Sequence, residues 1–402
     1  MGKPTIRFEG YTDDWEQRKL GELAEIVGGG TPSTGMDSYW DGDIDWYAPA
    51  EIGEQIYLES SQRKITEEGL NKSSAKILPI GTVLFTSRAG IGKTAILLKE
   101  GCTNQGFQSI VPNKEKLDSY FIFTRSEELK EYGEKVGAGS TFVEVSGKQM
   151  ANMDLMMPKT MSEQQQIGEY FQTIDHLITL HQRKCEETKK LKKFMLQKMF
   201  PQKGEKVPKI RFDGFTDDWE QRKFGDLVEK YEDPVKTPTE GYMRLGIRSH
   251  AKGTFHSYVE KGKELETAKM FRVAADKFIV NITFGWEHAV AITDEDDAGK
   301  LVSHRFPQYS FNNGILPKFF RYLILDEKFK HHLELSSPGG AGRNRVLKLS
   351  DMLEYKMNFP CEEEQRKIAV YFDDLDHLIT LHQRKCEELQ NIKKFMLQNM
   401  FV

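Results

Sequence analysis

The sequence has few cysteines, no long apolar run and little net charge, and each shortage excludes a class of protein. The four cysteines form no CxxC pair, which argues against a structural zinc site and against a disulfide framework. No apolar run approaches the ~20 residues that a membrane helix requires, and the opening MGKPTIRFEG lacks the apolar centre of a signal peptide. We therefore expect a cytoplasmic protein without membrane association. The net charge of −4 argues mildly against general coating of nucleic acid but allows a local basic patch.

An internal repeat covers about half of the 402 residues. The thirteen residues DHLITLHQRKCEE occur at 175–187 and again, letter for letter, at 376–388. A second pair of near-copies begins each half of the chain, at residues 4–23 and 208–227. The repeated segments surround two different inserts. Recombination between repeats explains identical copies without any functional demand, whereas a functional explanation is one partner that docks on two matching surfaces.

The two inserts differ in sequence but share an order of elements. The first carries GTVLFTSRAGIGKTAI at residues 81–96, and the second carries DKFIVNITFGWEHAVAI at residues 276–292. Each pattern predicts a strand, a turn and a second strand, followed by a further strand, a helix and a glycine-rich loop. We therefore expect two mixed α/β domains of one α+β fold with different surfaces.

The repeated segments that follow each insert predict long amphipathic helices. Apolar residues recur at alternating spacings of four and three, as at Ile167, Phe171, Ile174 and Ile178. About 38 residues give a helix of roughly 57 Å. The simplest way to bury both stripes is an antiparallel coiled coil with pseudo-twofold symmetry. The alternative is that each helix only covers its own domain. One histidine of each copy, His181 and His382, is expected on or beside the seam as a packed residue and not as a metal ligand, and Cys185 and Cys386 are expected there as small apolar residues.

These patterns predict four segments. Residues 1–160 form a first domain, 161–201 a first helix, 202–360 a second domain and 361–402 a second helix.

Several motifs resemble catalytic sites but fail on spacing. RAGIGKTAI resembles a phosphate-binding loop, but Ser87 occupies the position of the first glycine and no long helix follows. A β-turn between two strands is the better interpretation. Asp118, Glu128 and Lys130 match a nuclease carboxylate pattern only loosely, and His331, His332 and Glu334 lack the second half of a zinc site. We expect no active site and no metal site.

The inserts do contain polar and basic loop residues suited to reading DNA. Arginine can contact guanine and Asn or Gln can contact adenine through two hydrogen bonds, and glycine-rich loops let the backbone approach phosphates. The DNA-binding candidates are Thr31, Ser33, Thr34, Arg88, Lys93, Asn104, Gln105, Gln108, Ser140, Thr141, Arg244, Arg248, Ser249, His250, Lys252, Asn281, Trp286, Arg305, Arg343, Asn344 and Arg345.

The whole chain resembles the specificity subunits of type I restriction–modification enzymes. Three stretches resemble sequences of the recognition domains of that family, namely GGGTPSTGMDSYWDGDIDW, SRAGIGKTAI and CTNQGFQSIVP. A fourth stretch, EQQQIGEYF, resembles the start of the family's spacer helix. The resemblance implies two target-recognition domains in tandem that read a bipartite, asymmetric DNA target, with the helices setting the spacing. It also implies a non-catalytic subunit without a cofactor. The partners would be two adenine methyltransferase subunits that use S-adenosylmethionine and, where present, two restriction subunits that use ATP and Mg²⁺.

The repeated helical segment supplies the candidate partner-binding surface, because most of its polar residues fall outside the seam. They are Gln182, Arg183, Glu186, Glu187, Gln383, Arg384, Glu387 and Glu388. Two other functions stay open at this point. One is a coiled-coil scaffold that does not touch DNA, and the other is a nucleotide-dependent enzyme built on GIGKT.

Overall fold

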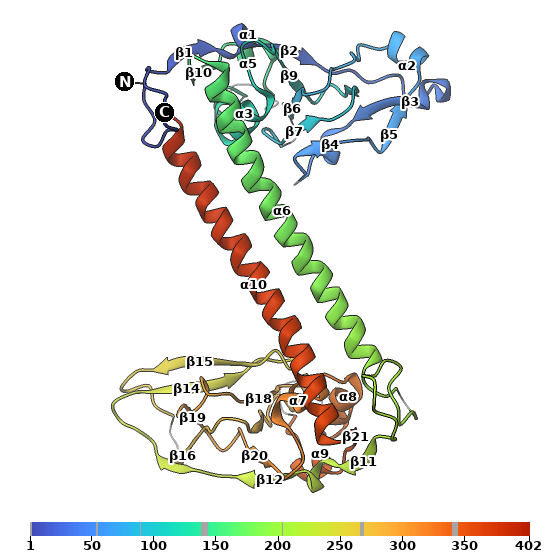
Figure 1. Cartoon of the computed structure of the whole chain (residues 1–402), viewed down its shortest axis with the longest axis vertical. Coiled ribbons are helices and arrows are strands. Elements are labelled where there is room, and N and C mark those ends of the chain that lie inside the picture. Colours follow the sequence, from blue (N-terminus) through green and yellow to red (C-terminus); the bar gives the residue numbers. More distant parts are fainter. Residues whose placement is uncertain are drawn as a thin grey trace. The chain divides into compact units, whose positions relative to one another are not determined.

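The computed structural model describes residues 2–53, 55–88, 90–137, 144–202, 204–265, 269–339 and 345–402. The chain forms two compact units, one made of Met1–Gln182 with Gln383–Val402 and the other of Arg183–His382 (Figure 1). We call them unit 1 and unit 2. Each unit therefore contains part of both long helices, so that unit 1 takes its last helical segment from the C-terminal end of the chain.

Unit 1 is built on a five-stranded sheet of order β2-β9-β6-β7-β4, a three-stranded sheet of order β5-β3-β8 and the antiparallel pair β1-β10. The strands are β1 Glu16–Lys19, β2 Ala24–Gly28, β3 Trp40–Tyr47, β4 Tyr57–Leu58, β5 Arg63–Ile65, β6 Val83–Phe85, β7 Thr94–Leu97, β8 Cys102–Thr103, β9 Gln108–Pro112 and β10 Asp154–Met157. The helices before the first long one are α1 Leu20–Leu23, η1 Asp37–Tyr39, η2 Pro49–Glu51, α2 Glu67–Asn71, α3 Ser119–Thr124, α4 Ser126–Gly137 and α5 Gly147–Ala151.

Unit 2 contains a four-stranded sheet of order β12-β20-β17-β18, a five-stranded sheet of order β13-β16-β19-β14-β15 and the antiparallel pair β11-β21. The strands are β11 Glu220–Lys223, β12 Val228–Tyr231, β13 Pro234–Lys236, β14 Tyr242–Ile247, β15 Thr254–Val259, β16 Lys269–Arg272, β17 Phe278–Val280, β18 Val290–Ile292, β19 Leu301–Val302, β20 Gln308–Phe311 and β21 Lys356–Phe359. Its shorter helices are η3 Phe224–Asp226, η4 Gly285–Glu287, α7 Pro317–Leu323, α8 Glu327–Leu335 and α9 Leu349–Leu353.

The repeated sequence at the start of each half forms the same ion pair in each unit, which we call the Arg–Glu clamp. In unit 1, Arg7 Nε donates to Glu163 Oε1 over 2.7 Å, and in unit 2 Arg211 Nε donates to Glu364 Oε1 over 2.7 Å. Both carboxylates are buried, so each needs a charged partner that removes the cost of burying an unpaired charge. The clamp explains why arginine and glutamate recur together in both copies.

The long helices are α6, Met161–Lys198, and α10, Glu362–Met400, and they pack antiparallel as the heptad spacing predicts (Figure 1). In unit 1, Lys393 Nζ lies 2.6 Å from Asp175 Oδ1, and in unit 2 Lys192 Nζ lies 2.5 Å from Asp376 Oδ1. The mixed α/β fold with paired long helices is thus confirmed. The alternative, in which each helix only covers its own domain, is also partly present, because the first turns of each helix pack into the core of the domain that precedes it.

The seam residues are mostly buried. In unit 1, Ile167 and Phe171 join a core that contains Trp15, Phe121 and Met400. The cysteines of the repeat are small buried seam residues, as predicted: Cys185 Sγ approaches Ile379 O at 3.9 Å in unit 2, and Cys386 Sγ approaches Ile178 O at 3.7 Å in unit 1. His181 and His382 are half-buried.

Candidate nucleic-acid interface

The stretch that resembles a phosphate-binding loop is a tight turn between β6 and β7. Thr86 N donates to Lys93 O over 3.0 Å, Gly92 N donates to Thr86 O over 3.0 Å, and Thr86 Oγ1 donates to Gly90 O over 2.6 Å. Strand β7 follows directly at Thr94, so the turn does not lead into a helix. The predicted turn is therefore present, and the arrangement that cradles a phosphate in P-loop enzymes is not formed by these residues.

Five of the DNA-binding candidates of unit 1 come together at three loops. Thr31, after β2, hydrogen-bonds Gln105, which lies between β8 and β9. In the same loop Asn104 Oδ1 accepts from Gly106 N over 2.7 Å. A Cβ built on Gly106 would lie 3.6 Å from Arg88 Nε, and one built on Gly28 would lie 3.6 Å from Gln108 Oε1. We call Thr31, Arg88, Asn104, Gln105 and Gln108 the unit 1 loop cluster.

The two cations of the turn between β6 and β7, Arg88 of the cluster and Lys93, have no acidic partner among the residues that the structure describes. Within the described part of the chain, no carboxylate lies within ion-pair distance of Arg88 or Lys93. Ser33 and Thr34 are exposed in the loop after β2, whereas Ser140 and Thr141 lie outside the described residues. The cluster thus presents amides, a hydroxyl and a guanidinium that pairs with no described carboxylate, a set that can both read base edges and bind phosphate.

In unit 2, the turn between β14 and β15 carries Arg248, Ser249, His250 and Lys252. The turn is fixed against η4, because Ser249 Oγ donates to Glu287 Oε2 over 2.5 Å and His250 N donates to Glu287 O over 2.9 Å. Arg248 lies with its guanidinium 5.4 Å from the ring centroid of Phe255. These contacts hold the backbone of the turn while Arg248, His250 and Lys252 stay exposed.

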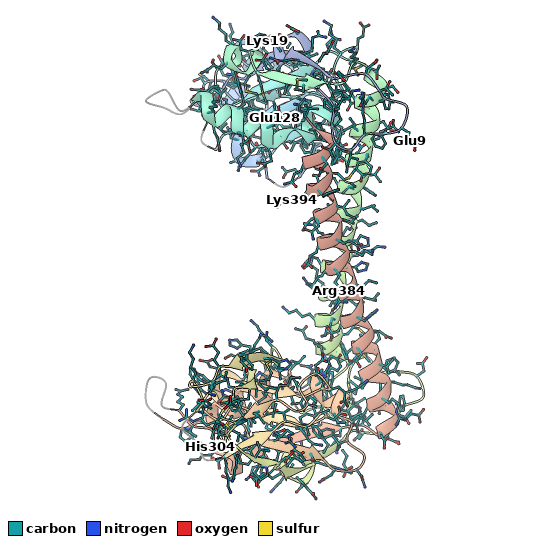
Figure 2. All side chains as sticks on the ribbon, turned by 90° about the vertical axis from the view of Figure 1, so that its left-hand side faces the viewer. Glu9, Lys19, Glu128, His304, Arg384 and Lys394 are labelled. Atoms are coloured by element: carbon teal, nitrogen blue, oxygen red, sulfur yellow. The ribbon has the colours of Figure 1, made fainter. Side chains whose placement is uncertain are left out.

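Four unit 2 candidates line one cavity of ≈ 620 Å³, namely Arg244, Ser249, Asn281 and Arg305. Asn281 is buried, and its Oδ1 accepts from Thr283 Oγ1 over 2.7 Å and from Thr283 N over 3.1 Å. The carboxamide oxygen of Asn281 therefore stabilises its own turn. Arg244 and Arg305 are exposed, and no described carboxylate pairs with either. His304, labelled in Figure 2, also lines this cavity.

The remaining unit 2 candidates form a separate contact. Trp286 Nε1 donates to Thr283 O over 3.2 Å, and the Arg345 guanidinium lies 5.5 Å from the Trp286 ring centroid. Such a cation–π contact holds an arginine over an aromatic face. Arg343 and Asn344 lie outside the described residues.

The loosely matched catalytic patterns have structural partners. Asp118 caps α3, where its Oδ1 accepts from Phe121 N over 2.8 Å, and burial raises the pKa of its carboxyl group. Glu128 is paired with Arg125 over 2.7 Å, and His332 Nε2 lies 2.7 Å from Asp351 O. Among the residues that the structure describes, no group of three or more His, Cys, Asp or Glu side chains is arranged to hold a metal ion.

The partner-binding candidates on the helices are exposed but are largely paired within their own helix. Arg183 Nε donates to Glu187 Oε1 over 2.8 Å, which raises the pKa of Arg183, and Lys189 Nζ lies 2.8 Å from Glu186 Oε1. Their copies Gln383, Arg384, Glu387 and Glu388 are also exposed, with Arg384 on α10 shown in Figure 2. Gln182 is exposed as well.

Sequence reasoning missed an apolar surface beside the seam. In unit 2 it consists of Leu191, Phe194, Leu378 and Leu381, all more than 40% exposed. In unit 1 it consists of Ile392 and Phe395, also exposed, with the half-buried Leu177 and Leu180. We call these two sets the apolar rows. Their spacing of three residues outside the seam was the available signal, because two packed helices need only the seam itself.

Within the described ranges, no helix is long and apolar enough to span a bilayer.

Comparison with known proteins connects these features to one family. Residues 12–190 and 216–391 match a family model described as the type I restriction modification DNA specificity domain. The type I restriction enzyme MjaIX specificity subunit of Methanocaldococcus jannaschii is 33% identical over 225 residues, which cover 54% of this chain and 52% of that protein. The EcoR124I/EcoR124II specificity subunit of Escherichia coli is 29% identical over 170 residues and is covered to 41%. The matches thus span about half the length of these two relatives.

Two further comparisons cover nearly the whole chain. The MjaVIII specificity subunit of M. jannaschii is 22% identical over 399 residues, which cover 95% of this chain and 91% of that protein. The crystal structure of a type I restriction–modification S subunit from M. genitalium aligns with a TM-score of 0.61 at 13% identity and covers 100% of this chain and 99% of its own. At that identity the structural likeness shows the fold alone. Because the family model matches both halves, the chain belongs to the type I restriction modification DNA specificity family.

Proposed function

We propose that the chain is the DNA-recognition subunit of a type I restriction–modification enzyme and that each unit reads one half of a bipartite, asymmetric duplex target. The proposal rests on one observation: the two units share the same scaffold but differ in their loops. Both units keep the Arg–Glu clamp, through Arg7–Glu163 and Arg211–Glu364. The unit 1 loop cluster and the unit 2 cavity have different side chains, so they would select different bases.

The chemistry of the loops supports sequence reading more than general DNA coating. Asn104, Gln105 and Gln108 supply amides that can form paired hydrogen bonds with adenine, and Arg88 supplies a guanidinium that can do so with guanine. The net charge of −4 leaves little general attraction to phosphate, so binding would depend on these local groups. DNA recognition would take place in the cytoplasm, with the two long helices setting the number of unread bases between the half-sites.

Two methyltransferase subunits are the proposed partners, one for each apolar row. The rows are repeated because the helices are repeated, so a single partner type would find the same apolar surface in each unit. Large exposed apolar side chains on a helix pair suit an amphipathic helix of a partner. Glu187 and Glu388 lie seven residues before Phe194 and Phe395, on the same helical line, and would border the contact. The other charged candidates of the repeat stay part of the predicted surface.

The chemistry would belong to the partners. We assign S-adenosylmethionine to the methyltransferase subunits, and ATP and Mg²⁺ to restriction subunits where these are present, with no cofactor held by this chain. The tight turn from Thr86 to Lys93 supports this assignment over a P-loop enzyme, because the turn leads into β7.

Methylome sequencing of cells that carry the chain and its methyltransferase tests the proposal. The unaltered chain should give one asymmetric bipartite motif. Replacing residues 24–157 with the corresponding segment of a relative that has a different target should change one half of that motif only. A change in both halves, or methylation without a motif, would contradict the assignment of one half-site to each unit.

A coiled-coil scaffold that does not touch DNA is the second candidate, and the exposed apolar rows favour it as well. Binding of a target duplex at fixed salt distinguishes the two functions. If the double variant Arg88→Ala and Arg244→Ala binds DNA as tightly as the unaltered chain, the scaffold is supported. A loss of at least tenfold in affinity supports DNA recognition.

A further inference from the structure

The cavity of unit 2 is a hollow in the surface beside the ribbon of β14 and β15. Its volume of ≈ 620 Å³ falls in the range of about 300–1,000 Å³ that is typical of sites for small ligands. The residues that matter for its chemistry are Arg244, Phe255, Asn281, Phe284, Glu287 and Arg305.

Two phenylalanine side chains line the cavity and are partly exposed to solvent. Phe255 is 40% exposed and Phe284 is 38% exposed. The Phe255 ring lies over Gly246, its cross-strand partner, since a Cβ added to Gly246 would lie 2.3 Å from the Phe255 Cζ. The glycine therefore leaves room for the ring to lie against the sheet. Exposed ring faces of this kind favour a flat ligand that can stack on them.

The polar groups of the cavity form a mixed set of donors and acceptors. Among the described residues, the side-chain hydrogen bonds of Asn281 use its oxygen, which leaves its amide NH₂ for a ligand. Glu287 uses Oε2 to accept from Ser249, which leaves Oε1 as an acceptor. Arg244 and Arg305 add guanidinium groups without an acidic partner in the described part of the unit. A neighbouring donor and acceptor suit the edge of a nucleobase, and free guanidinium groups suit phosphate.

The shape of the site decides how a base could reach it. Groove reading requires protein elements that protrude into the groove, and a hollow cannot touch base edges that lie inside a duplex. A base turned out of the duplex is flat, stacks on aromatic side chains and offers its Watson–Crick edge for hydrogen bonds.

On the basis of the proposed function, we infer that the unit 2 cavity binds one base of the DNA target after that base has turned out of the helix. Phe255 and Phe284 stack on the base, Asn281 and Glu287 contact its edge, and Arg244 and Arg305 hold the neighbouring phosphates. Unit 2 therefore reads part of its half-site from an unstacked nucleotide.

The fluorescence of 2-aminopurine, which rises when the base leaves the stack, tests the inference in the complex of the full chain with its methyltransferase. The probe replaces each base of the unit 2 half-site in turn, except the adenine that the methyltransferase itself must turn out. We expect a rise of several-fold at one position. The double variant Phe255→Leu and Phe284→Leu should abolish it, and Tyr258→Leu should preserve it, because Tyr258 is 61% exposed on β15 and does not line the cavity.

The outcomes separate this inference from the proposed function. No rise at any position, in a complex that still protects both half-sites in a footprint, overturns the base-binding cavity while DNA recognition stands. A rise that persists in the double phenylalanine variant also overturns it. A third arm adds each deoxynucleoside monophosphate to the chain alone. Saturable binding that the double variant loses, without any duplex signal, would assign the cavity to a free nucleotide instead. Hydrogen exchange of β14 and β15 checks that each variant is folded.

Discussion

At the scale of single residues, the turn between β6 and β7 depends on two glycines with left-handed backbone angles. Gly90 has φ of +107° and Gly92 has φ of +95°. A Cβ on Gly90 would meet nothing within 4 Å, whereas a Cβ on Gly92 would lie 2.3 Å from Lys130 Cγ and 2.4 Å from Lys130 Cβ. Both positions favour glycine for backbone reasons, but only Gly92 also lacks space.

Alanine substitutions at Gly90 and Gly92 should separate the cost of backbone strain from the cost of steric crowding. Gly90→Ala should lower the free energy of unfolding by about 1–2 kcal/mol, because an L-residue is strained at positive φ. Gly92→Ala should lower it by roughly 1 kcal/mol more, because α4, which carries Lys130, must shift as well. Denaturant unfolding followed by tryptophan fluorescence gives both values. Equal effects of the two substitutions would show that Lys130 moves aside at no cost.

A buried histidine makes the stability of unit 2 depend on pH. His288 is 4% exposed, and burial lowers its pKa from 6.5 to about 4. At this position the unfolded chain therefore binds a proton more readily than the folded chain. The contribution of neutral His288 to the free energy of unfolding is complete above about pH 6.5 and declines as the pH falls toward 4. The decline amounts to about 3 kcal/mol.

Asparagine is a suitable replacement for His288, because the position has φ of +60° and Asn tolerates that region. The free energy of unfolding, measured from pH 7.5 to 4.5, should fall less steeply for His288→Asn than for the unaltered chain. Parallel pH profiles for the two proteins would show that His288 takes up its proton equally well in both states. Carboxyl groups titrate in both proteins, so the difference between the profiles isolates the histidine.

At the scale of elements, sequence patterns predicted the helices well and the loops less well. The seam of Ile167, Phe171 and Ile174 was readable because helical periodicity depends on local spacing. Asn281 could not be placed in the same way: a polar residue after a strand can face solvent or fix its own turn, and here its oxygen does the latter. Phe255 and Phe284 were missed because an exposed ring and a core ring look alike in sequence. Their role depends on which surfaces the fold brings together.

The ion pair between the two long helices occurs once in each unit, and the two copies can be compared directly because their aspartates differ in burial. The Asp175 side chain is 8% exposed beside Lys393, while the Asp376 side chain is 44% exposed beside Lys192. Each aspartate also accepts a hydrogen bond from a tyrosine, Asp175 from Tyr120 Oη over 2.9 Å and Asp376 from Tyr322 Oη over 3.1 Å. Asp175→Asn should cost about 1–3 kcal/mol in unit 1, since it removes a carboxylate that pairs with Lys393 away from solvent. Asp376→Asn should cost about 0–1 kcal/mol in unit 2.

Hydrogen exchange followed by mass spectrometry measures the two units separately. Amides of α6 in unit 1 should lose protection in Asp175→Asn, and amides of α10 in unit 2 should change little in Asp376→Asn. A larger loss of protection in Asp376→Asn than in Asp175→Asn would contradict this prediction. It would show that burial of the aspartate does not decide the strength of these ion pairs.

At the scale of the whole molecule, the repeat predicts the number of partners. Unit 1 and unit 2 each present an apolar row whose largest side chain is a phenylalanine, Phe395 at 55% exposure and Phe194 at 47%. The inserts of the two units have diverged, whereas the helical rows differ only in Leu191 of unit 2 against Ile392 of unit 1, so we expect one type of partner to dock on both. One chain should therefore bind two methyltransferase subunits independently.

Charge at the centre of each row tests that stoichiometry. Phe194→Glu should yield complexes with one methyltransferase, because burying a carboxylate in an apolar contact without a cation weakens binding at least tenfold. Combining Phe194→Glu with Phe395→Glu should abolish the complex, whereas Thr179→Glu with Thr380→Glu should leave two partners bound, because these exposed residues lie on the side of each helix opposite Leu177 and Leu378. Native mass spectrometry counts the subunits directly. If Phe194→Glu alone removed both methyltransferases, the partners would have to contact each other and not two separate rows.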